Sequence, residues 1–294
     1  MIWVTGRNGM LGRAVVEALS REQRAHIATA MGDVDLTDPN AIETFLNTHR
    51  GAIDQIINCT AYTQVDRAES EPHLAHALNT RVPQLLAESA KKRGIRIQHI
   101  STDYVFDGRA NAPYKENSPC NPLGVYGRTK YEGEQALLAS SPAHCVVRTS
   151  WLTGTGKATF ASAIIRKLVG GEELRVVDDQ FGRATFCGDL ARAMLGPLSS
   201  HGGLVHYSCT ETLSWFSYAR TIATILERRQ IIPEGRGSAI IPIGSEELPR
   251  AAPRPAYSAL DCNLYAAIAN APPPPFQTLL EEFIDATITD RQQT

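Results

Sequence analysis

The chain has 294 residues, which suits one large domain or two smaller ones, and 43% hydrophobic and 20% charged residues are ordinary for a globular protein. A net charge of −2 without a run of Lys or Arg gives a nucleic acid or an anionic membrane no electrostatic footprint. No run of about eighteen apolar residues is present and the first residues do not read as a signal peptide, so we expect a cytoplasmic protein with no membrane partner.

The six cysteines are scattered along the chain and form no CxxC pair, which is typical of reduced cytosolic thiols. His73 and His76 lie three residues apart in a helical stretch. No cluster of carboxylates and histidines accompanies them, so a solvated helix face is favoured over a metal pair. We therefore expect no metal site.

The first half of the chain alternates apolar runs with helical periods. Asp38 is a plausible N-cap, Pro39 fits the first helical position, and Gly94 suits a helix end. This alternation predicts an α/β fold with a Rossmann-type, doubly wound parallel sheet. Strands are predicted at 2–6, 26–31, 54–62, 95–102 and 145–152, and helices at 11–20, 38–49, 69–93 and 126–138.

The alternation loosens after about Trp151, and the segments 247–265 and 271–276 are rich in proline, which indicates turns and extended loops. Residues 1–150 are predicted to form a dinucleotide-binding domain, with returning segments near 180–210. Residues 151–294 are predicted to form mainly a smaller substrate-binding domain over the C-terminal edge of the sheet. Further helices are predicted at 158–169, 188–198, 214–229 and 276–287, and strands at 173–179 and 203–209.

The segment "GRNGMLG" places Gly6, Gly9 and Gly12 directly after the first strand and at the start of a helix. A tight turn and a close approach to a pyrophosphate both require missing side chains, and the helix N-terminus favours an anion. A turn that only packs the helix on the strand is the alternative. The predicted cofactor contacts in this segment are Gly6, Arg7, Asn8, Gly9, Met10, Leu11 and Gly12.

The second strand is not followed directly by the acid that usually binds the ribose of NAD. Arg7 could instead face a 2′-phosphate, so NADPH is favoured and NADH remains possible. Asp35 and Leu36 lie where an adenine edge could be held.

Tyr126 and Lys130 lie four residues apart, and therefore on one face of a predicted helix. A neighbouring lysine cation would lower the pKa of a phenol toward neutrality and make it useful in acid–base catalysis. The same spacing also occurs by chance in many helices. Thr102 lies at the carboxyl end of a strand, where such sheets bind ligands, and its alternative role is a strand-end cap.

Several motifs together carry a resemblance to a known family. The chain resembles the dTDP-4-dehydrorhamnose reductases, which belong to the extended short-chain dehydrogenase/reductases, from Met1 to about Phe283. The motifs are GxxGxxG, "NCTAYTQVDRAESEP", "NT", "STDYVFDG", "NPLGVYGRTKYEGE", "RTSWL", "DQFGRATFCGDLA" and "RPAYSALD".

The resemblance implies an NAD(P)H-dependent enzyme that reduces the 4-keto group of dTDP-4-dehydro-L-rhamnose to give dTDP-L-rhamnose. It implies that Tyr126 protonates the new alkoxide, that Lys130 orients the cofactor, and that Thr102 polarises the ketone. It also implies a role in polysaccharide biosynthesis and a monomer or homodimer. Further implied contacts are Cys59, Thr60, Ala61, Tyr62 and Asn79 for the cofactor, and Thr63, Val65, Asp103, Tyr104, Trp151 and Arg254 for the nucleotide-diphosphate sugar.

The chain departs from the family pattern at several positions. Cys59 and Thr60 replace alanines in the groove, Ala184 replaces a proline, and Thr159 stands where an asparagine is frequent. "CNLY" stands where a lysine usually closes the segment after "RPxxSxLD". Arg13 and Ala14 follow Gly12 in place of a glutamate that serves a metal-linked dimer in some members, which again predicts no metal.

Other functions stay open at this point. Nucleotide-sugar 4,6-dehydratases need a glutamate after "STD", where this chain has Tyr104, and a 4-epimerase needs room for the sugar to turn. A regulatory subunit of methionine adenosyltransferase looks like the same family and works by binding alone. A reductase of a different nucleotide 4-keto-sugar is the remaining alternative.

Overall fold

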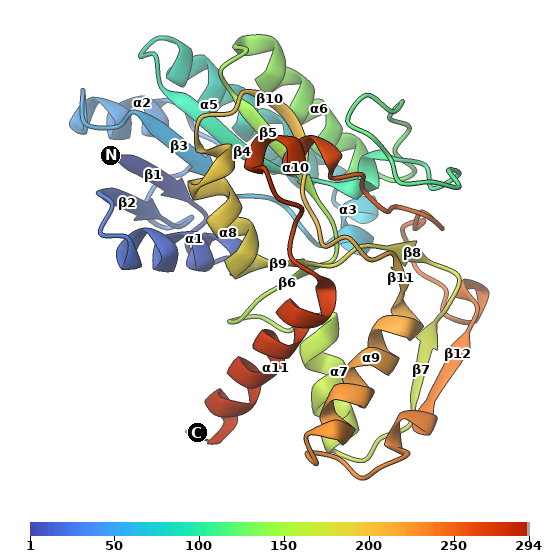
Figure 1. Cartoon of the computed structure of the whole chain (residues 1–294). Helices are drawn as coiled ribbons and strands as arrows, with labels where there is room; N and C mark the ends of the chain where they lie inside the picture. Colours follow the sequence, from blue (N-terminus) through green and yellow to red (C-terminus); the bar gives the residue numbers. More distant parts are fainter. Residues whose placement is uncertain (293–294) are drawn as a thin grey trace.

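The computed structural model describes residues 1–292, with side chains described for residues 1–288. A six-stranded parallel sheet lies at the centre of the upper lobe in Figure 1. Its strands are short and buried on both faces, which is typical of a parallel sheet covered by helices and confirms the predicted fold class. In sheet order the strands are β10 (Gly203–His206), β5 (Cys145–Thr149), β4 (Arg96–Thr102), β3 (Gln55–Asn58), β1 (Ile2–Thr5) and β2 (His26–Thr29).

Helices cover both faces of this sheet. One hydrophobic cluster joins the strands to α1 and α8, and a second joins them to α2 and α5 and to Leu137 of α6. Residues 187–206 thus return to the sheet after the chain has left it. The covering helices are α1 (Met10–Arg21), α2 (Pro39–Thr48), α5 (Val82–Lys91), α6 (Val125–Ser140) and α8 (Cys187–Leu195).

The prediction of a single helix at 69–93 is wrong in detail. Helix formation starts earlier and is interrupted at Glu71, whose backbone (φ −123°, ψ 50°) is not helical because Pro72 follows it. Gly94, with φ +66°, ends the stretch as predicted. The observed segments are α3 (Val65–Ser70), α4 (Pro72–His76), the π-helical turn η1 (Ala77–Arg81) and α5.

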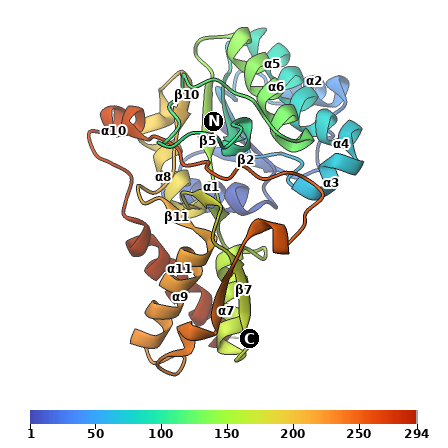
Figure 2. The same cartoon turned by 90° about the vertical axis from the view of Figure 1, so that its right-hand side faces the viewer.

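The lower lobe has its own hydrophobic core, built from helices that pack against a parallel pair of strands (Figures 1 and 2). Ser214 caps one of these helices by accepting a hydrogen bond from the Ser217 N–H at 3.0 Å. The elements of this lobe are α7 (Phe160–Val169), β7 (Leu174–Val177), α9 (Trp215–Arg228), β12 (Ile240–Ile243) and α11 (Phe276–Gln292).

Strand β12 and helix α10 (Asn263–Ala269) are among the elements that were not predicted from the sequence. Strand β12 contains Pro242 and pairs only with β7, so its pattern is short and interrupted. Helix α10 follows the proline-rich segment and packs Tyr265 against Tyr207 of the upper lobe. Short strands join the lobes: β6 (Leu152–Thr153) pairs with β9 (Thr185–Phe186), and β8 (Phe181–Gly182) pairs with β11 (Leu213–Ser214). The remaining short turns are 3-10 helices: η2 (Asp103–Val105), η3 (Pro197–Ser199), η4 (Arg236–Ala239) and η5 (Ser245–Glu247).

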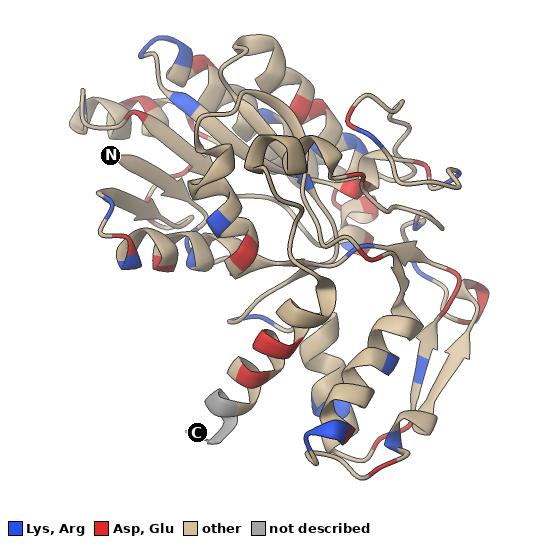
Figure 3. Ribbon diagram, in the orientation of Figure 1, with Lys and Arg blue, Asp and Glu red and all other residues tan. Residues whose placement is uncertain are grey.

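Acidic and basic residues are interspersed over both lobes (Figure 3). Within residues 1–292, none of the helices has the length and apolar character needed to cross a membrane.

Candidate active site

The glycine turn joins β1 to α1 in a shape that only glycine allows. Gly6 has φ +74°, and a Cβ on Gly12 would lie 2.2 Å from the Gly6 carbonyl oxygen. Gly9 begins the helix without a side-chain cap. The N–H groups of the first helical turn are therefore free to bind an anion beside the cavity, which fits the pyrophosphate of a dinucleotide.

A cavity of about 340 Å³ lies beside this turn, at the carboxyl ends of the central strands. It brings together residues from the glycine turn, the loop after β3, the end of β4, helix α6 and the loop after β5. The predicted site residues that line it are Gly9, Met10, Leu11, Cys59, Thr60, Ala61, Thr63, Val65, Thr102, Asp103, Tyr104, Tyr126, Lys130 and Trp151.

Other predicted residues do not line this cavity. Gly6, Asn8 and Gly12 shape the turn at its edge. The Asp35 carboxylate accepts from the Thr37 hydroxyl at 2.6 Å and holds its own turn. Leu36 is buried in the core formed with α2 and α5.

Arg7 lies near the carboxyl end of β2. Its Nη2 is 3.1 Å from Asp33 Oδ2, and its Nη1 donates to the Ala28 carbonyl at 3.3 Å. Both charged side chains are nearly half exposed. The Arg7 cation and the Asp33 anion therefore lie together at the end of β2. Folds of this kind bind the ribose of a dinucleotide at this position.

Tyr62 and Asn79 support the wall of the cavity from behind. Asn79 lies in the π-helical turn η1, and its Oδ1 accepts from the Tyr62 N–H at 2.8 Å. Its Nδ2 donates to the Tyr62 carbonyl at 3.1 Å and to Thr129 Oγ1 at 3.2 Å. The fully buried amide thus fixes the loop after β3 against helix α6.

Thr102 ends strand β4 and caps the 3-10 turn that follows. Its Oγ1 accepts from the Tyr104 N–H at 3.2 Å and lies 3.1 Å from Asp103 Oδ1. Thr102 lowers the pKa of the Tyr126 phenol, and both side chains line the same cavity. The structure therefore brings the predicted threonine and tyrosine to one site.

The phenol of Tyr126 is harder to ionise here than the spacing with Lys130 suggests. Burial, and to a smaller extent Asp103, raise its pKa to about 12, against the hydrogen bond from Thr102, which lowers it. Burial lowers the pKa of Lys130 to about 8. The Lys130 amine donates to the Ile100 carbonyl of strand β4, so its nearest partners are on the sheet.

Asp103 contributes a buried carboxylate oxygen to the cavity wall. Among the described atoms its Oδ2 has no partner within hydrogen-bond distance. Burial raises the pKa of Asp103 to about 6, against the nearby Ser258 hydroxyl, which lowers it. Because Asp103 also lines the cavity, this oxygen is suited to a hydroxyl group of a ligand.

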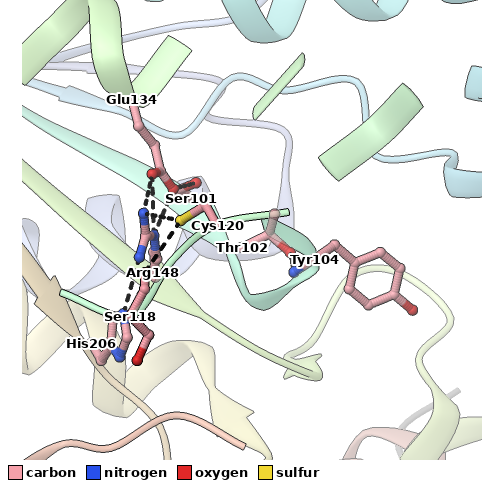
Figure 4. A network of polar contacts seen from close by, with 8 residues as sticks. All are labelled: Ser101, Thr102, Tyr104, Ser118, Cys120, Glu134, Arg148 and His206. Carbon is pink, nitrogen blue, oxygen red and sulfur yellow. Dashed lines mark hydrogen bonds and ion pairs between the residues drawn. The ribbon is translucent and has the colours of Figure 1, made fainter. Parts of the chain in front are cut away.

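A buried ion pair lies beneath the carboxyl end of strand β4 (Figure 4). Arg148 of β5 bonds both oxygens of Glu134 of α6, with Nη2 to Oε2 at 2.7 Å. Ser101 donates to the same carboxylate, and Arg148 also contacts Cys120 and His206. This network ties α6 to the strand that carries Thr102.

A second cavity of about 440 Å³ extends from the first between the lobes, and the two share Tyr104 and Trp215. The rings of Trp151 and Trp215 stack with their centroids 3.6 Å apart. Four cationic side chains line the second cavity, which suits a diphosphate and its nucleoside: Lys167, Arg175, Arg250 and Arg254.

Arg254 is held in place by a carboxylate of the upper lobe. Its Nη1 lies 2.6 Å from Asp66 Oδ1 and its Nη2 lies 2.9 Å from Oδ2. The guanidinium lines the second cavity together with Tyr104, which packs edge-on against Tyr126 with ring centroids 5.7 Å apart. Arg254, the residue that is predicted to bind the diphosphate, is thus connected to the wall of the first cavity.

Sequence reasoning missed part of the lining. The strand-end rule applied to "RTSW" would have found Thr149 and Ser150, but Lys157 and Trp215 come from other segments that no local spacing connects to the site. The missed lining residues are Ile100, Ser101, Thr149, Ser150, Leu152, Lys157 and Trp215. Among the described residues, no three His, Cys, Asp or Glu side chains gather as a metal site would require.

Comparison with known proteins decides the family. The family model described as the RmlD substrate binding domain matches residues 1–289. The chain belongs to this family. The resemblance to dTDP-4-dehydrorhamnose reductases that the motifs indicate is thereby confirmed.

Two relatives in sequence illustrate the names that similar proteins carry. A dTDP-4-dehydrorhamnose reductase of Mycobacterium tuberculosis is 37% identical over 276 residues, covering 92% of this chain and 87% of that protein. A probable dTDP-4,6-dihydroxy-2-methyloxan-3-one 4-ketoreductase of Streptomyces antibioticus is 36% identical over 286 residues, covering 96% and 94%.

Solved structures show the same fold. A dTDP-4-dehydrorhamnose reductase of Bacillus anthracis in complex with NADP has a TM-score of 0.88 and 32% identity, covering 97% of this chain and 98% of that one. Its counterpart from Clostridium acetobutylicum has a TM-score of 0.88 and 35% identity, with the same coverage.

Proposed function

We propose that this chain reduces the 4-keto group of dTDP-4-dehydro-L-rhamnose to give dTDP-L-rhamnose, with NADPH as the preferred cofactor and NADH as a possible one. The observation that carries the proposal is the convergence of Thr102, Tyr126 and Lys130 on one cavity beside the glycine turn. The names of the relatives give the substrate class. Bound NADPH would supply the hydride.

The residues of the chain have separate tasks in this reaction. Tyr126 gives its phenolic proton to the oxygen of the former ketone, and Thr102 holds that oxygen through its hydroxyl. Lys130, one turn along the same helix, supplies positive charge to the cavity in which the phenolate forms. The partnerless Asp103 Oδ2 accepts a hydrogen bond from a sugar hydroxyl, and the stacked Trp151 forms the apolar side of the sugar pocket.

The two lobes divide the ligands between them. Residues 1–150, with the returning segments near 180–210, hold the cofactor through the glycine turn. Residues 151–294 mainly bind the nucleotide-diphosphate sugar, with Arg254 directed to the diphosphate; residues 293 and 294 lie outside the described residues. The protein acts as a monomer or homodimer. All six cysteines are free, which fits the reducing cytoplasm.

A different dTDP 4-keto-sugar is the second candidate substrate, because the Streptomyces antibioticus relative is named for one. Not all departures from the family pattern bear on this choice. Thr159 caps helix α7, accepting from the Ser162 N–H at 3.2 Å, and Ala184 is buried, so neither lines the cavities. Cys59 and Thr60 do line the first cavity.

The test is turnover by the purified protein. NADPH oxidation is followed by the loss of its near-ultraviolet absorbance with dTDP-4-dehydro-L-rhamnose as substrate, and the product is identified by nuclear magnetic resonance (NMR). Formation of dTDP-L-rhamnose supports the proposal. NADPH binding without oxidation would support a binding-only subunit, and turnover of only the alternative keto-sugar would support the second candidate.

A further inference from the structure

A buried row of polar side chains stands behind Lys130. It runs from Asn58 at the end of β3 through His99 of β4 to the Lys130 amine. Asn58 and His99 are fully buried, and Lys130 is 2% exposed. Water cannot satisfy groups at this depth, so each hydrogen bond along the row constrains the next.

The orientation of the Asn58 amide is fixed by its neighbours. The backbone N–H of Thr60, which can only donate, lies 3.1 Å from Oδ1. The Thr5 hydroxyl also donates to Oδ1, at 2.7 Å, while accepting from Thr60 Oγ1 at 3.2 Å. A flipped amide would set its NH₂ group against the Thr60 N–H. The Nδ2 of Asn58 therefore faces His99.

This orientation selects the tautomer of His99. Asn58 Nδ2 lies 3.0 Å from His99 Nδ1, so Nδ1 accepts a hydrogen bond and carries no proton. Burial, with the nearby Lys130, holds the pKa of His99 well below its usual range, so the ring is neutral. Its one proton is then on Nε2, which lies 3.2 Å from Lys130 Nζ.

The Nε2–H of His99 favours one protonation state of Lys130. An ammonium group has only donors, so it would meet His99 donor to donor. A neutral amine has a lone pair that accepts from Nε2–H, while one of its N–H groups donates to the Ile100 carbonyl. The row therefore satisfies every group only when Lys130 has given up its third proton.

The other ionisable groups around Lys130 do not account for the preference for a neutral amine. Glu134, one turn further along α6, raises the pKa of Lys130, but its carboxylate is bound by Arg148 and Ser101. Cys59 at the end of β3 is a neutral thiol, since burial raises its pKa to about 12. Tyr126, on the same helix, is also neutral near pH 7. Burial is the main cause that lowers the pKa of Lys130, to about 8.

We propose that His99, oriented by Asn58, is a positioning residue that weakens the hold of Lys130 on its proton and so lowers the upper pH limit of the Tyr126–Lys130 pair. Above that limit the lysine is neutral and no longer stabilises a phenolate. The effect on the pH limit rests on the proposed reductase function. The positions of the protons on His99 and Lys130 do not depend on that function.

The first test reads the tautomer directly. The purified protein is labelled with ¹⁵N-histidine, and the ring nitrogens of His99 are assigned by their loss in His99→Gln. The proposal predicts a neutral ring with the proton on Nε2 at pH 7. A proton on Nδ1, or on both nitrogens, would overturn it. No substrate is needed, so this result stands even if the protein turns over no keto-sugar.

The second test uses a nearly isosteric change to reverse the direction of the hydrogen bonds between residue 58 and His99 and between His99 and Lys130. In Asn58→Asp, the carboxylate still accepts from Thr5 and Thr60 but now also accepts from His99, which moves the ring proton to Nδ1. His99 Nε2 then accepts from the Lys130 ammonium. We expect the pKa of Lys130, followed by NMR of labelled lysine, to rise by about one pH unit or more. The alkaline limb of kcat/KM should move by the same amount.

His99→Gln is the matched variant. Its amide can accept from Asn58 and donate to Lys130, as the imidazole does, so the pKa of Lys130 should stay within about 0.3 of the wild-type value. An unchanged lysine pKa in Asn58→Asp, or an equal rise in both variants, would overturn the proposal. If Asn58→Asp does not fold, the wild-type tautomer and His99→Gln still decide it.

Discussion

Tyr126 and Lys130 lie one turn apart on α6, and both reach the same cavity. Their spacing predicted this, because side chains four residues apart share a helix face. It did not predict their partners. The pKa of the phenol responds to burial and to Thr102, and the amine lies against Ile100 and His99 of strand β4. The surroundings of each group, rather than the spacing, set its pKa.

Removing the phenolic hydroxyl tests the role of Tyr126. In Tyr126→Phe, we expect kcat/KM for the keto-sugar to fall at least about a hundredfold, because the phenol is the group proposed to protonate the sugar oxygen. Affinity for NADPH, measured by fluorescence titration, should be unchanged. Near-full turnover by this variant would show that another group protonates the sugar oxygen.

Arg7 and Asp33 together should set the cofactor preference. Arg7→Ala should raise the Kd for NADPH about tenfold and change the Kd for NADH much less, because only NADPH carries the 2′-phosphate. Asp33→Asn removes the carboxylate that pairs with Arg7 and should shift the preference further toward NADPH. Both constants are measured by the same titration. Equal losses for the two cofactors in Arg7→Ala would mean that Arg7 does not contact the 2′-phosphate.

At the scale of elements, the Glu134–Arg148 pair joins helix α6 to strands β4 and β5 (Figure 4). Both side chains are buried, so neither charge can be left without its partner. The Glu134 carboxylate of this pair also accepts a hydrogen bond from Ser101, which directly precedes Thr102 in the chain. It therefore holds the helix with Tyr126 and Lys130 in register with the strand end.

Breaking this pair should destabilise the fold. Glu134→Gln leaves the Arg148 cation buried without a counter-charge, so we expect the free energy of unfolding to fall by about 3–5 kcal/mol. Chemical denaturation monitored by circular dichroism measures it. The double variant Glu134→Gln/Arg148→Met removes the stranded charge and should recover part of the loss. A loss below about 1 kcal/mol in the single variant would mean that the buried pair is not needed.

At the scale of elements, some features can be predicted from local sequence patterns alone. Asp38 caps α2 as predicted, with its carboxylate accepting from the Asn40 N–H at 2.9 Å, because an N-cap depends only on neighbouring residues. The break at Glu71 also has a local cause, since a proline restricts the residue before it. Strand β12 has no such signal, since its existence depends on pairing with β7, more than sixty residues earlier.

At the scale of the whole molecule, the strand–helix alternation predicted the sheet, and the strand-end rule placed most of the first cavity. The second cavity could not be predicted in this way. Trp215 reaches Trp151 only because the lower lobe folds back over the sheet edge, and Arg254 is placed by Asp66 of the upper lobe. Contacts between such distant segments leave no periodic trace in a single sequence.

The Asp66–Arg254 pair is one such contact, and it connects the lobes through the predicted diphosphate site. In Asp66→Asn, Arg254 loses its bidentate partner, so we expect KM for the nucleotide sugar to rise about tenfold with kcat nearly unchanged. Steady-state kinetics at saturating NADPH measure both constants. Asp54→Asn is the control, because within the described part of the chain the Asp54 carboxylate pairs with the N-terminal amine and lines neither cavity. An unchanged KM in Asp66→Asn would mean that the pair does not orient Arg254 for substrate.

The central claim is that the chain transfers a hydride to C4 of a nucleotide-bound sugar. The most direct measurement uses NADPH deuterated at the nicotinamide C4, with dTDP-4-dehydro-L-rhamnose as substrate, and locates the label in the product by NMR. We predict one deuterium at C4 of the sugar in dTDP-L-rhamnose, and none when Tyr126→Phe replaces the wild-type protein over the same period. An unlabelled sugar with unconsumed NADPH, or deuterium at another carbon, would contradict the account.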